Sequence, residues 1–382
     1  MNKTIIAKWL NVAWLLPCLC LVGCSSDNDS VGAGDTGARP LTFTVSTDAT
    51  ESVTRGVPLN ALDGEFGVFC SQYTGTWSPG HALNFMYNEM VMGNGTAWTT
   101  SEGYFVPAQP NKLKFFAYYP YYDDVVSNGS IIKMDGDNTT AYEAPSFNYT
   151  MPTNAEDQYD LMYAISEELQ ADNAGKLGTV HLNFHHLLTA ITIAAKGTEG
   201  GTIKRVTLKN LYPKGDFEFI ERDPLHPEYG VLRANKSGAK DVYADLNLKI
   251  VKDADYVQAD EGLSFMIILQ PLTSGGDPNL HEEASMEVKF EAPGGKIYTF
   301  TKPLDAALKA ALTTSKNTLL RLSVESLKRI TVKATITDWE HGANFDGAVS
   351  DQPQIELESL ISDWDGTGNT TDIQTGPQVT NP

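Results

Sequence analysis

Apolar and polar residues alternate along most of this chain with the two-residue period of half-buried β-strands. In the first such segment, Leu41, Phe43 and Val45 are separated by threonines. Helical signals are confined to 159–170, where one or two turns are predicted, and to 303–312. The pattern therefore predicts an all-β fold made of β-sandwiches. The other strand-like segments are 66–70, 112–119, 180–184, 188–194, 203–208, 242–250, 263–269, 286–290, 297–300, 319–324 and 330–336.

Residues 1–23 have the features of an export signal that ends at a cysteine. Lys3 and Lys8 are the only charges before Cys24, and the apolar run 9–22 follows them. This run is shorter than the roughly 20 residues that cross a bilayer, and it has the size of a signal-peptide core. The tripeptide Leu-Val-Gly before Cys24 matches the bacterial lipobox, so we predict that 1–23 is removed and that Cys24 receives a lipid. An ordinary signal peptide with an incidental cysteine is the alternative.

Residues 24–40 have the composition of a flexible tether. They are rich in Gly, Ser, Asp and Asn, with too few apolar residues to offset the entropy cost of ordering. Asp27 and Asp29 resemble the acidic signal that directs lipoproteins of the Bacteroidetes to the outer face of the outer membrane. Two or three acyl chains make such an anchor stable. We therefore expect a surface-exposed protein held at the cell outer membrane by its lipid.

Charge and cysteine content narrow the class of protein further. The formal net charge of −20 argues against nucleic acid as a partner, because the phosphate backbone is itself anionic. Of the four cysteines, two leave with the signal and Cys24 is lipidated, so Cys70 alone remains and no intrachain disulfide can form. Because Cys70 lies in an apolar strand pattern, we expect a buried structural thiol.

The spacing of candidate metal and catalytic motifs argues against each of them. His181, His185 and His186 lie in an alternating strand pattern, which places His181 and His185 on one face and His186 on the other. A zinc site is therefore not expected there. The segment 363–369 resembles the start of a calcium loop, but position twelve is Gln374 instead of glutamate. The sequence has no nucleophile elbow, Walker loop or HExxH motif, so we expect no catalytic residues, no metal and no cofactor.

Five short motifs follow one another along the chain. They are Phe-Gly-Val-Phe at 66–69, Leu-Lys-Phe-Phe-Ala-Tyr-Tyr-Pro at 113–120, Asp-Leu-Met-Tyr-Ala at 160–164, Leu-Asn-Phe-His-His-Leu-Leu at 182–188 and Thr-Asp-Trp at 337–339. Together with the lipobox, their order resembles the fimbrillin family, the shaft and tip subunits of the type V pili of Bacteroidia. The resemblance implies two tandem transthyretin-like β-sandwich domains, 41–190 and 191–382. It also implies a structural assembly protein and not an enzyme.

The resemblance further implies a mechanism of activation. In the family, a trypsin-like, arginine-specific protease removes an N-terminal strand, and a strand of an adjoining pilus subunit fills the groove that opens. In this chain the removable strand and its cleavage loop would be 41–55. Leu41, Phe43 and Val45 would then be the apolar residues that leave the core.

Arg55 is the residue at which the resemblance places the cut, with Gly56 as the new N-terminus. The segment 48–54 is polar and has the composition of an exposed loop, which a protease can reach. Arg39 is the other arginine nearby, but Pro40 follows it, and trypsin-like enzymes cut poorly before proline. The alternative is that Arg55 is one more surface arginine.

The chain continues well beyond the last of the five motifs. Forty-three residues follow Trp339, and 354–361 alternates, with Ile355, Leu357 and Ile361 on one face. This segment is either a donor strand for the next subunit or the last strand of the C-terminal domain. The sequence leaves both open, and with them the choice between a shaft and a tip subunit.

A surface glycan-binding lipoprotein is the competing function. Such a protein would also be an anchored β-sandwich, and it would bind sugars on exposed aromatic rings. Tyr118 and Tyr119 lie within one of the five motifs, so at least one of them is expected to be buried. The candidate rings are Trp77, Trp98, Tyr118, Tyr119, Tyr121 and Tyr122.

Overall fold

The fold is known from a computed structural model of the chain. It describes residues 41–47, 62, 64–78, 81–93, 98–123, 132–134, 145–171, 179–219, 230–259, 264–269, 280–304, 308–309, 312, 317–327, 329–337 and 357–360. Over these ranges the regular structure is almost entirely β-strand, in four sheets. The predicted all-β fold class is confirmed.

Seven of the described strands form a closed ring. Their order is β2-β3-β4-β1-β10-β8-β5, and the ring closes because β5 also pairs with β2. The short strand β9 adds to β5 outside the ring. The strands are β1 (Phe43–Thr47), β2 (Phe66–Tyr73), β3 (Met86–Gly93), β4 (Trp98–Thr100), β5 (Lys112–Tyr119), β8 (Met162–Ile165), β9 (Leu169–Gln170) and β10 (Val180–His186).

Large aromatic side chains fill the inside of this ring. Phe43, Phe66, Trp98, Phe115 and Phe184 are buried there and lie against one another edge to face or tilted. They come from β1, β2, β4, β5 and β10, so five strands meet in one cluster. Aromatic pairs of this geometry contribute about 0.5–1.5 kcal/mol each beyond the burial of their area.

Two further sheets face each other as a β-sandwich. One has the order β15-β12-β18-β19, and the other has the order β16-β11-β20-β21-β22, with β17 also paired to β11. Ile193 of β11, Val206 of β12, Val288 of β18 and Leu322 of β20 are buried in the core that the sheets share. The strands are β11 (Thr189–Gly197), β12 (Gly201–Leu211), β15 (Lys240–Ile250), β16 (Val257–Gln258), β17 (Phe265–Ile267), β18 (Ser285–Glu291), β19 (Ile297–Pro303), β20 (Asn317–Ser326), β21 (Arg329–Thr337) and β22 (Leu357–Leu360).

The fourth sheet draws its strands from both sides of residue 190. Its order is β14-β13-β7-β6, and β7 pairs antiparallel with β13. Phe147 of β7 lies 4.6 Å from Phe217 of β13, and Phe219 lies 5.7 Å from Phe116 of β5, both measured between ring centroids. The division into two tandem transthyretin-like domains at residue 190 stays a prediction. The strands are β6 (Ile132–Met134), β7 (Ser146–Thr150), β13 (Lys214–Glu218) and β14 (Val231–Asn235).

The predicted helical turns at 159–170 are wrong. This stretch contains β8 and β9, and a short 3₁₀ turn, η1 (Ala155–Asp157), precedes it. β8 pairs with β5 on one side and with β10 on the other. These cross-strand contacts outweigh the weak helical propensity of so short a segment. In the second stretch with a helical signal, 303–312, Leu308 and Lys309 are helical.

Candidate functional site

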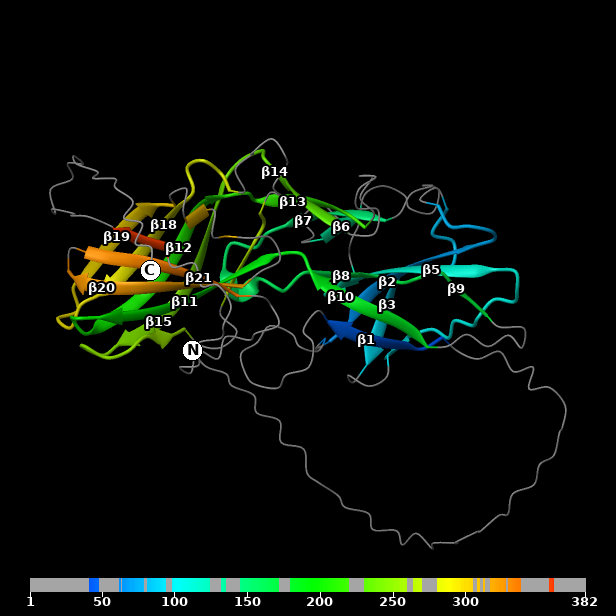
Figure 1. The fold of residues 1–382 in the computed structure, drawn as a ribbon, viewed down its shortest axis with the longest axis horizontal. Helices are drawn as coiled ribbons and strands as arrows, with labels where there is room; N and C mark the ends of the chain where they lie inside the picture. Colours follow the sequence, from blue (N-terminus) through cyan, green and yellow to red (C-terminus); the bar gives the residue numbers. More distant parts are fainter. Residues whose placement is uncertain are drawn as a thin grey trace, which may run out of the picture. The chain divides into compact units, whose positions relative to one another are not determined.

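The candidate site is the slot that β1 occupies between β4 and β10. β1 runs parallel to β10, in a register that begins with Phe43 opposite Val180 and ends with Thr47 opposite Phe184. Its pairing with β4 is antiparallel and consists of Phe43 opposite Trp98 (Figure 1, dark blue). β1 therefore joins two strands of the ring that do not pair with each other in the sheet order.

Backbone hydrogen bonds continue the slot beyond the N-terminal end of β1. The backbone N–H of Leu41 donates to the carbonyl of Tyr104 at 2.8 Å. The N–H of Val180 donates to the carbonyl of Thr42 at 2.9 Å. The main chain of 41–47 is thus held from both sides.

The inward side of this segment carries the predicted apolar residues. Leu41 and Phe43 are buried, and Val45 is half-buried and packs on the same core. The Phe43 ring meets Phe115 at 5.6 Å and Phe66 at 6.2 Å, both edge to face. Burial of each such side chain contributes about 1.5–3 kcal/mol. The strand is therefore an integral part of the aromatic core and not a surface addition.

The outward side of β1 carries hydroxyl groups that meet one histidine of β10. The Thr44 hydroxyl lies 3.1 Å from His181 Nδ1, and the Ser46 hydroxyl lies 3.3 Å from His181 Nε2. The Ser46 hydroxyl also donates to Asn183 Oδ1 at 2.8 Å. The sequence pattern placed His181 and His185 on one face of the strand and His186 on the other, and their burial confirms this: His181 is exposed, His185 is half-buried and His186 is buried. The contact with β1 was not predicted.

The two ends of β10 pair with different strands. Among the described strand pairings, β8 meets β10 at His185 and His186, whereas residues 180–184 pair with β1. At the supported end, His186 Nδ1 lies 2.8 Å from Asp160 Oδ2, and both side chains are almost fully buried. The backbone N–H of Leu187 also donates to the carbonyl of Leu161 at 2.8 Å. One end of β10 is anchored without β1, and the other depends on it.

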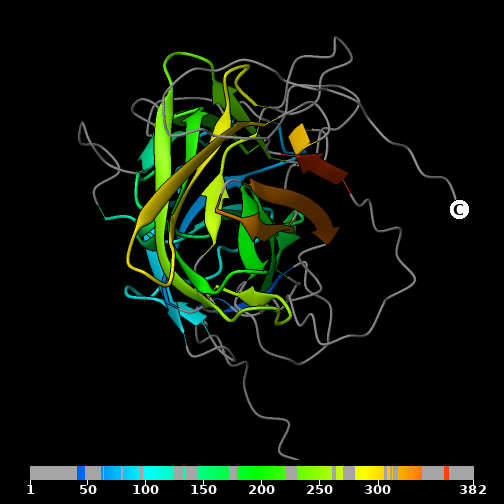
Figure 2. The ribbon, with the colours of Figure 1, turned by 90° about the vertical axis from the view of Figure 1, so that its left-hand side faces the viewer.

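The C-terminal segment contributes a strand to the sandwich. β22 pairs antiparallel with β21, from Ala334 opposite Leu357 to Thr331 opposite Leu360 (Figure 2, red). Leu357, one of the predicted donor residues, therefore lies in a strand at the end of its own sheet. Ile355 and Ile361 lie outside the described residues.

Three predicted processing residues lie outside the described residues. These are Cys24, Arg55 and Gly56. The described chain stops at Thr47 and resumes at Leu62, so Arg55 belongs to the connection between β1 and β2.

Cys70 is fully buried, as the strand pattern predicted. Burial raises the pKa of its thiol well above the ordinary value, because the thiolate is poorly solvated there.

The aromatic side chains proposed for glycan binding do not form an exposed platform. Trp98, Tyr118 and Tyr119 are buried in the two cores, Trp77 and Tyr122 are partly buried against one of them, and Tyr121 is half-buried. Lys114 places its ammonium 5.7 Å from the centre of the Trp77 ring. These observations argue against the glycan-binding alternative.

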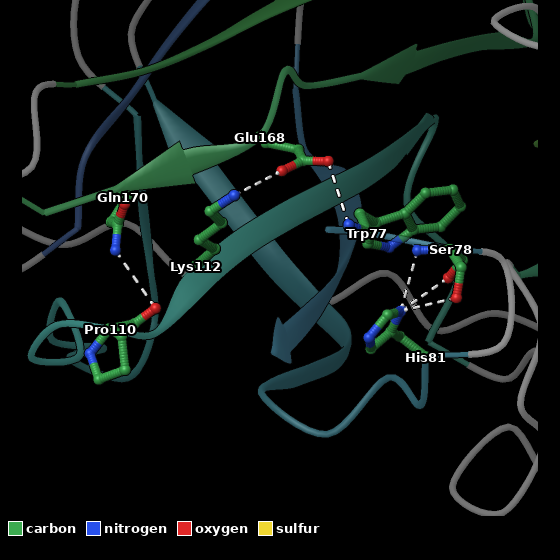
Figure 3. A network of polar contacts seen from close by, with 7 residues as sticks. All are labelled: Trp77, Ser78, His81, Pro110, Lys112, Glu168 and Gln170. Carbon is green, nitrogen blue, oxygen red and sulfur yellow. Dashed lines mark hydrogen bonds and ion pairs between the residues drawn. The ribbon is translucent and has the colours of Figure 1, made fainter. Parts of the chain in front are cut away.

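The neighbourhood of Trp77 is a structural polar network (Figure 3). The carboxylate of Glu168 accepts hydrogen bonds from Lys112 Nζ at 3.1 Å and from the backbone N–H of Trp77 at 3.2 Å. The hydrogen bond from Lys112 lowers the pKa of the Glu168 carboxyl. The side-chain amide of Gln170 donates to the carbonyl of Pro110 at 3.2 Å. The network ties β9 and the loop at Trp77 to β5.

The described part of the chain holds neither a metal-binding cluster nor a membrane-spanning helix. The described residues contain no group of three or more His, Cys, Asp and Glu side chains that could hold a metal ion. Over the same ranges, no helix combines the length and the apolar character needed to span a membrane.

The fold and the slot define an all-β protein in which one N-terminal strand closes the first sheet. The chain belongs to the fimbrillin-like family, whose model matches residues 54–339. Because this family consists of fimbrial structural and adhesion proteins, the predicted family and the prediction that the chain is not an enzyme are both confirmed. Proteins of this family are surface- or pilus-associated and interact with other fimbrial subunits.

Two individual proteins illustrate the relationship. The chain is 30% identical over 182 residues to the fimbrium subunit Fim1C of Phocaeicola vulgatus, and this match covers 45% of the chain and 47% of the relative. The match thus spans about half the length of that curated relative. A crystal structure of a fimbrial protein from Bacteroides vulgatus is similar in fold, with a TM-score of 0.52 and 18% identity. That similarity covers 78% of this chain and 99% of the other.

Proposed function

We propose that this chain is a pilus subunit that is exported as a lipoprotein and assembles by strand exchange. Residues 1–23 direct export, and the lipid on Cys24 holds the precursor at the outer membrane. A trypsin-like protease cuts after Arg55, and a strand of another subunit then takes the place of β1. The observation that carries the proposal is the position of β1: it closes a ring between two other strands, and the connection that follows it holds Arg55.

The geometry explains why loss of β1 would drive assembly. Removal of 41–47 uncovers the aromatic core where Phe43 lay, and it leaves residues 180–184 of β10 without the strand that pairs with them. Exposed strand edges and apolar core surface both favour addition of a new strand. A subunit cleaved in this way is stable only after it has bound one.

The donor would be the C-terminal segment 354–361 of an adjoining subunit. Its apolar residues Ile355, Leu357 and Ile361 would enter the vacated core. Side-chain burial does not by itself offset the entropy of ordering eight residues, so main-chain pairing with β10 must contribute as well. Release of β22 from β21 would have to come first, because this strand is paired within its own chain. A tip subunit would accept a strand and donate none.

Limited trypsin treatment of the mature protein tests this proposal. The expected product begins at Gly56, leaves the membrane and forms an SDS-resistant ladder. Arg55→Ala should give a folded, lipid-anchored monomer that forms no ladder, because its own β1 stays in place. Arg39→Ala is the matched control and should polymerise like the wild type. A normal ladder from the Arg55→Ala protein would contradict the proposal.

A further inference from the structure

We propose that His181 selects the strand that replaces β1, by favouring one with carboxylates at its two outward positions. This inference rests on the proposed strand exchange and goes beyond it, because it assigns a specificity-determining residue to the slot. The occupant it specifies is the C-terminal segment of a second copy of this chain.

His181 contacts two outward side chains of the strand in the slot at once. Its ring nitrogens lie 3.1 Å and 3.3 Å from the hydroxyls of Thr44 and Ser46, which are two residues apart on β1. Strand residues at this spacing point to the same face, so any strand in the slot presents two outward side chains to this one ring. The ring is solvent-exposed and comes from β10, which remains after cleavage.

The C-terminal segment repeats the pattern of the β1 segment. When 353–359 is laid on 41–47 in the same direction, apolar residues fall on apolar residues and a hydroxyl falls on the buried hydroxyl of Thr47. The opposite direction would place Ser359 on the buried Leu41 and Pro353 on Thr47, and it is therefore disfavoured. The correspondences are Ile355 on Phe43, Leu357 on Val45, Ser359 on Thr47, Glu356 on Thr44 and Glu358 on Ser46.

The two outward positions are where the segments differ in chemistry. Thr44 and Ser46 present hydroxyls, which can donate or accept, whereas Glu356 and Glu358 present carboxylates, which only accept. Carboxylates close to an imidazole favour its protonated form, which donates from both nitrogens, and hydrogen bonds between charged partners are roughly twice as strong as neutral ones. His181 would therefore hold the incoming strand more firmly than it holds β1.

One position works against the exchange. Pro353 falls on Leu41, whose backbone N–H donates to the carbonyl of Tyr104. Proline has no N–H, so this hydrogen bond would be lost. The stronger contacts at His181 would help to offset this loss.

The inference is tested by the rate at which the trypsin-cleaved full-length mature protein forms its SDS-resistant ladder. Glu356→Gln together with Glu358→Gln should slow the ladder about tenfold, the effect expected when charge-assisted hydrogen bonds become neutral. His181→Glu should slow it further by repelling both carboxylates. Adding Glu356→Lys and Glu358→Lys to His181→Glu should restore the rate.

His185→Glu is the matched control for the new charge. His185 lies on the same outward face of β10 but faces Tyr163 of β8 instead of β1, so this variant should keep the wild-type rate. Circular dichroism of the uncleaved variants verifies that they fold, and the tail variants leave the slot itself unchanged. Wild-type rates for His181→Glu and for the double glutamine variant would overturn the inference alone. A wild-type chain that is cut at Gly56 but forms no ladder would overturn the proposed function and the inference with it.

Discussion

Replacing Phe43 by alanine should destabilise the uncleaved protein and leave the assembled polymer unaffected. Phe43 is fully buried in the ring and touches Phe66 and Phe115 edge to face. Truncation of such a core phenylalanine removes its transfer free energy and leaves a cavity, at a cost of about 3–5 kcal/mol. In the polymer, the segment that contains Phe43 has been removed, so the substitution cannot change the stability of the polymer.

Guanidinium-induced unfolding measures both states. The buried ring of Trp98 lies 5.4 Å from Phe66, so its fluorescence reports on this core. The first unfolding transition of uncleaved Phe43→Ala should move to lower denaturant by the equivalent of about 3–5 kcal/mol. Polymer assembled from the same variant should unfold like wild-type polymer.

Phe66→Ala is the control that separates the two states. Phe66 lies in β2, which stays in the chain after cleavage, so this variant should be weaker both as uncleaved protein and as polymer. Two results would refute the reasoning. One is an uncleaved Phe43→Ala protein as stable as the wild type. The other is a Phe43→Ala polymer weakened as much as the Phe66→Ala polymer.

Three further predictions follow from single residues. Cys24→Ala should abolish fatty-acid labelling and release the protein from the membrane fraction, and unchanged labelling would rule out the anchor. Asp160→Ala should lower the free energy of unfolding by about 1–3 kcal/mol, because it leaves His186 buried without this partner; exposed Asp157→Ala should stay within about 0.5 kcal/mol. The Cys70 thiol should resist a disulfide reagent until the protein unfolds. The pKa of this thiol is raised in the folded protein, so the unfolded chain loses the thiol proton first as the pH rises. The free energy of unfolding should therefore be constant below the ordinary thiol pKa of about 8.5 and should decline above it. Unfolding curves measured at several pH values check this.

Strand positions could be predicted from the sequence because the two-residue period is a local signal. The split of His181 and His186 between the faces of β10 follows from that period alone, and so does the burial of Phe43. The short stretch at 159–170 was misread because its few apolar residues fit a helical turn as well as a strand. This stretch forms a strand because it pairs with β5 and β10, which come from elsewhere in the chain.

The pairing of strands could not be predicted, because it depends on contacts between distant residues. Thr44 and His181 meet although 137 residues separate them, and no local pattern encodes their parallel register. The same holds for the closure of the ring by β2 and β5 and for the sheet that joins β7 to β13. The apolar residues of β1 could therefore be predicted, whereas the histidine that faces its outward side could not.

Hydrogen exchange at residues 180–184 of β10 tests the central claim most directly. In the uncleaved protein the amides of this stretch that point toward β1, which alternate along the strand starting with the Val180 amide that donates to Thr42, should be protected. After cleavage at Arg55, dilute monomer should exchange rapidly there, while β8 stays protected by its pairing with β5. Protection at 180–184 should return in the polymer. Equal protection of 180–184 before and after cleavage would mean that β1 never leaves its slot, and the account of assembly by strand exchange would be wrong.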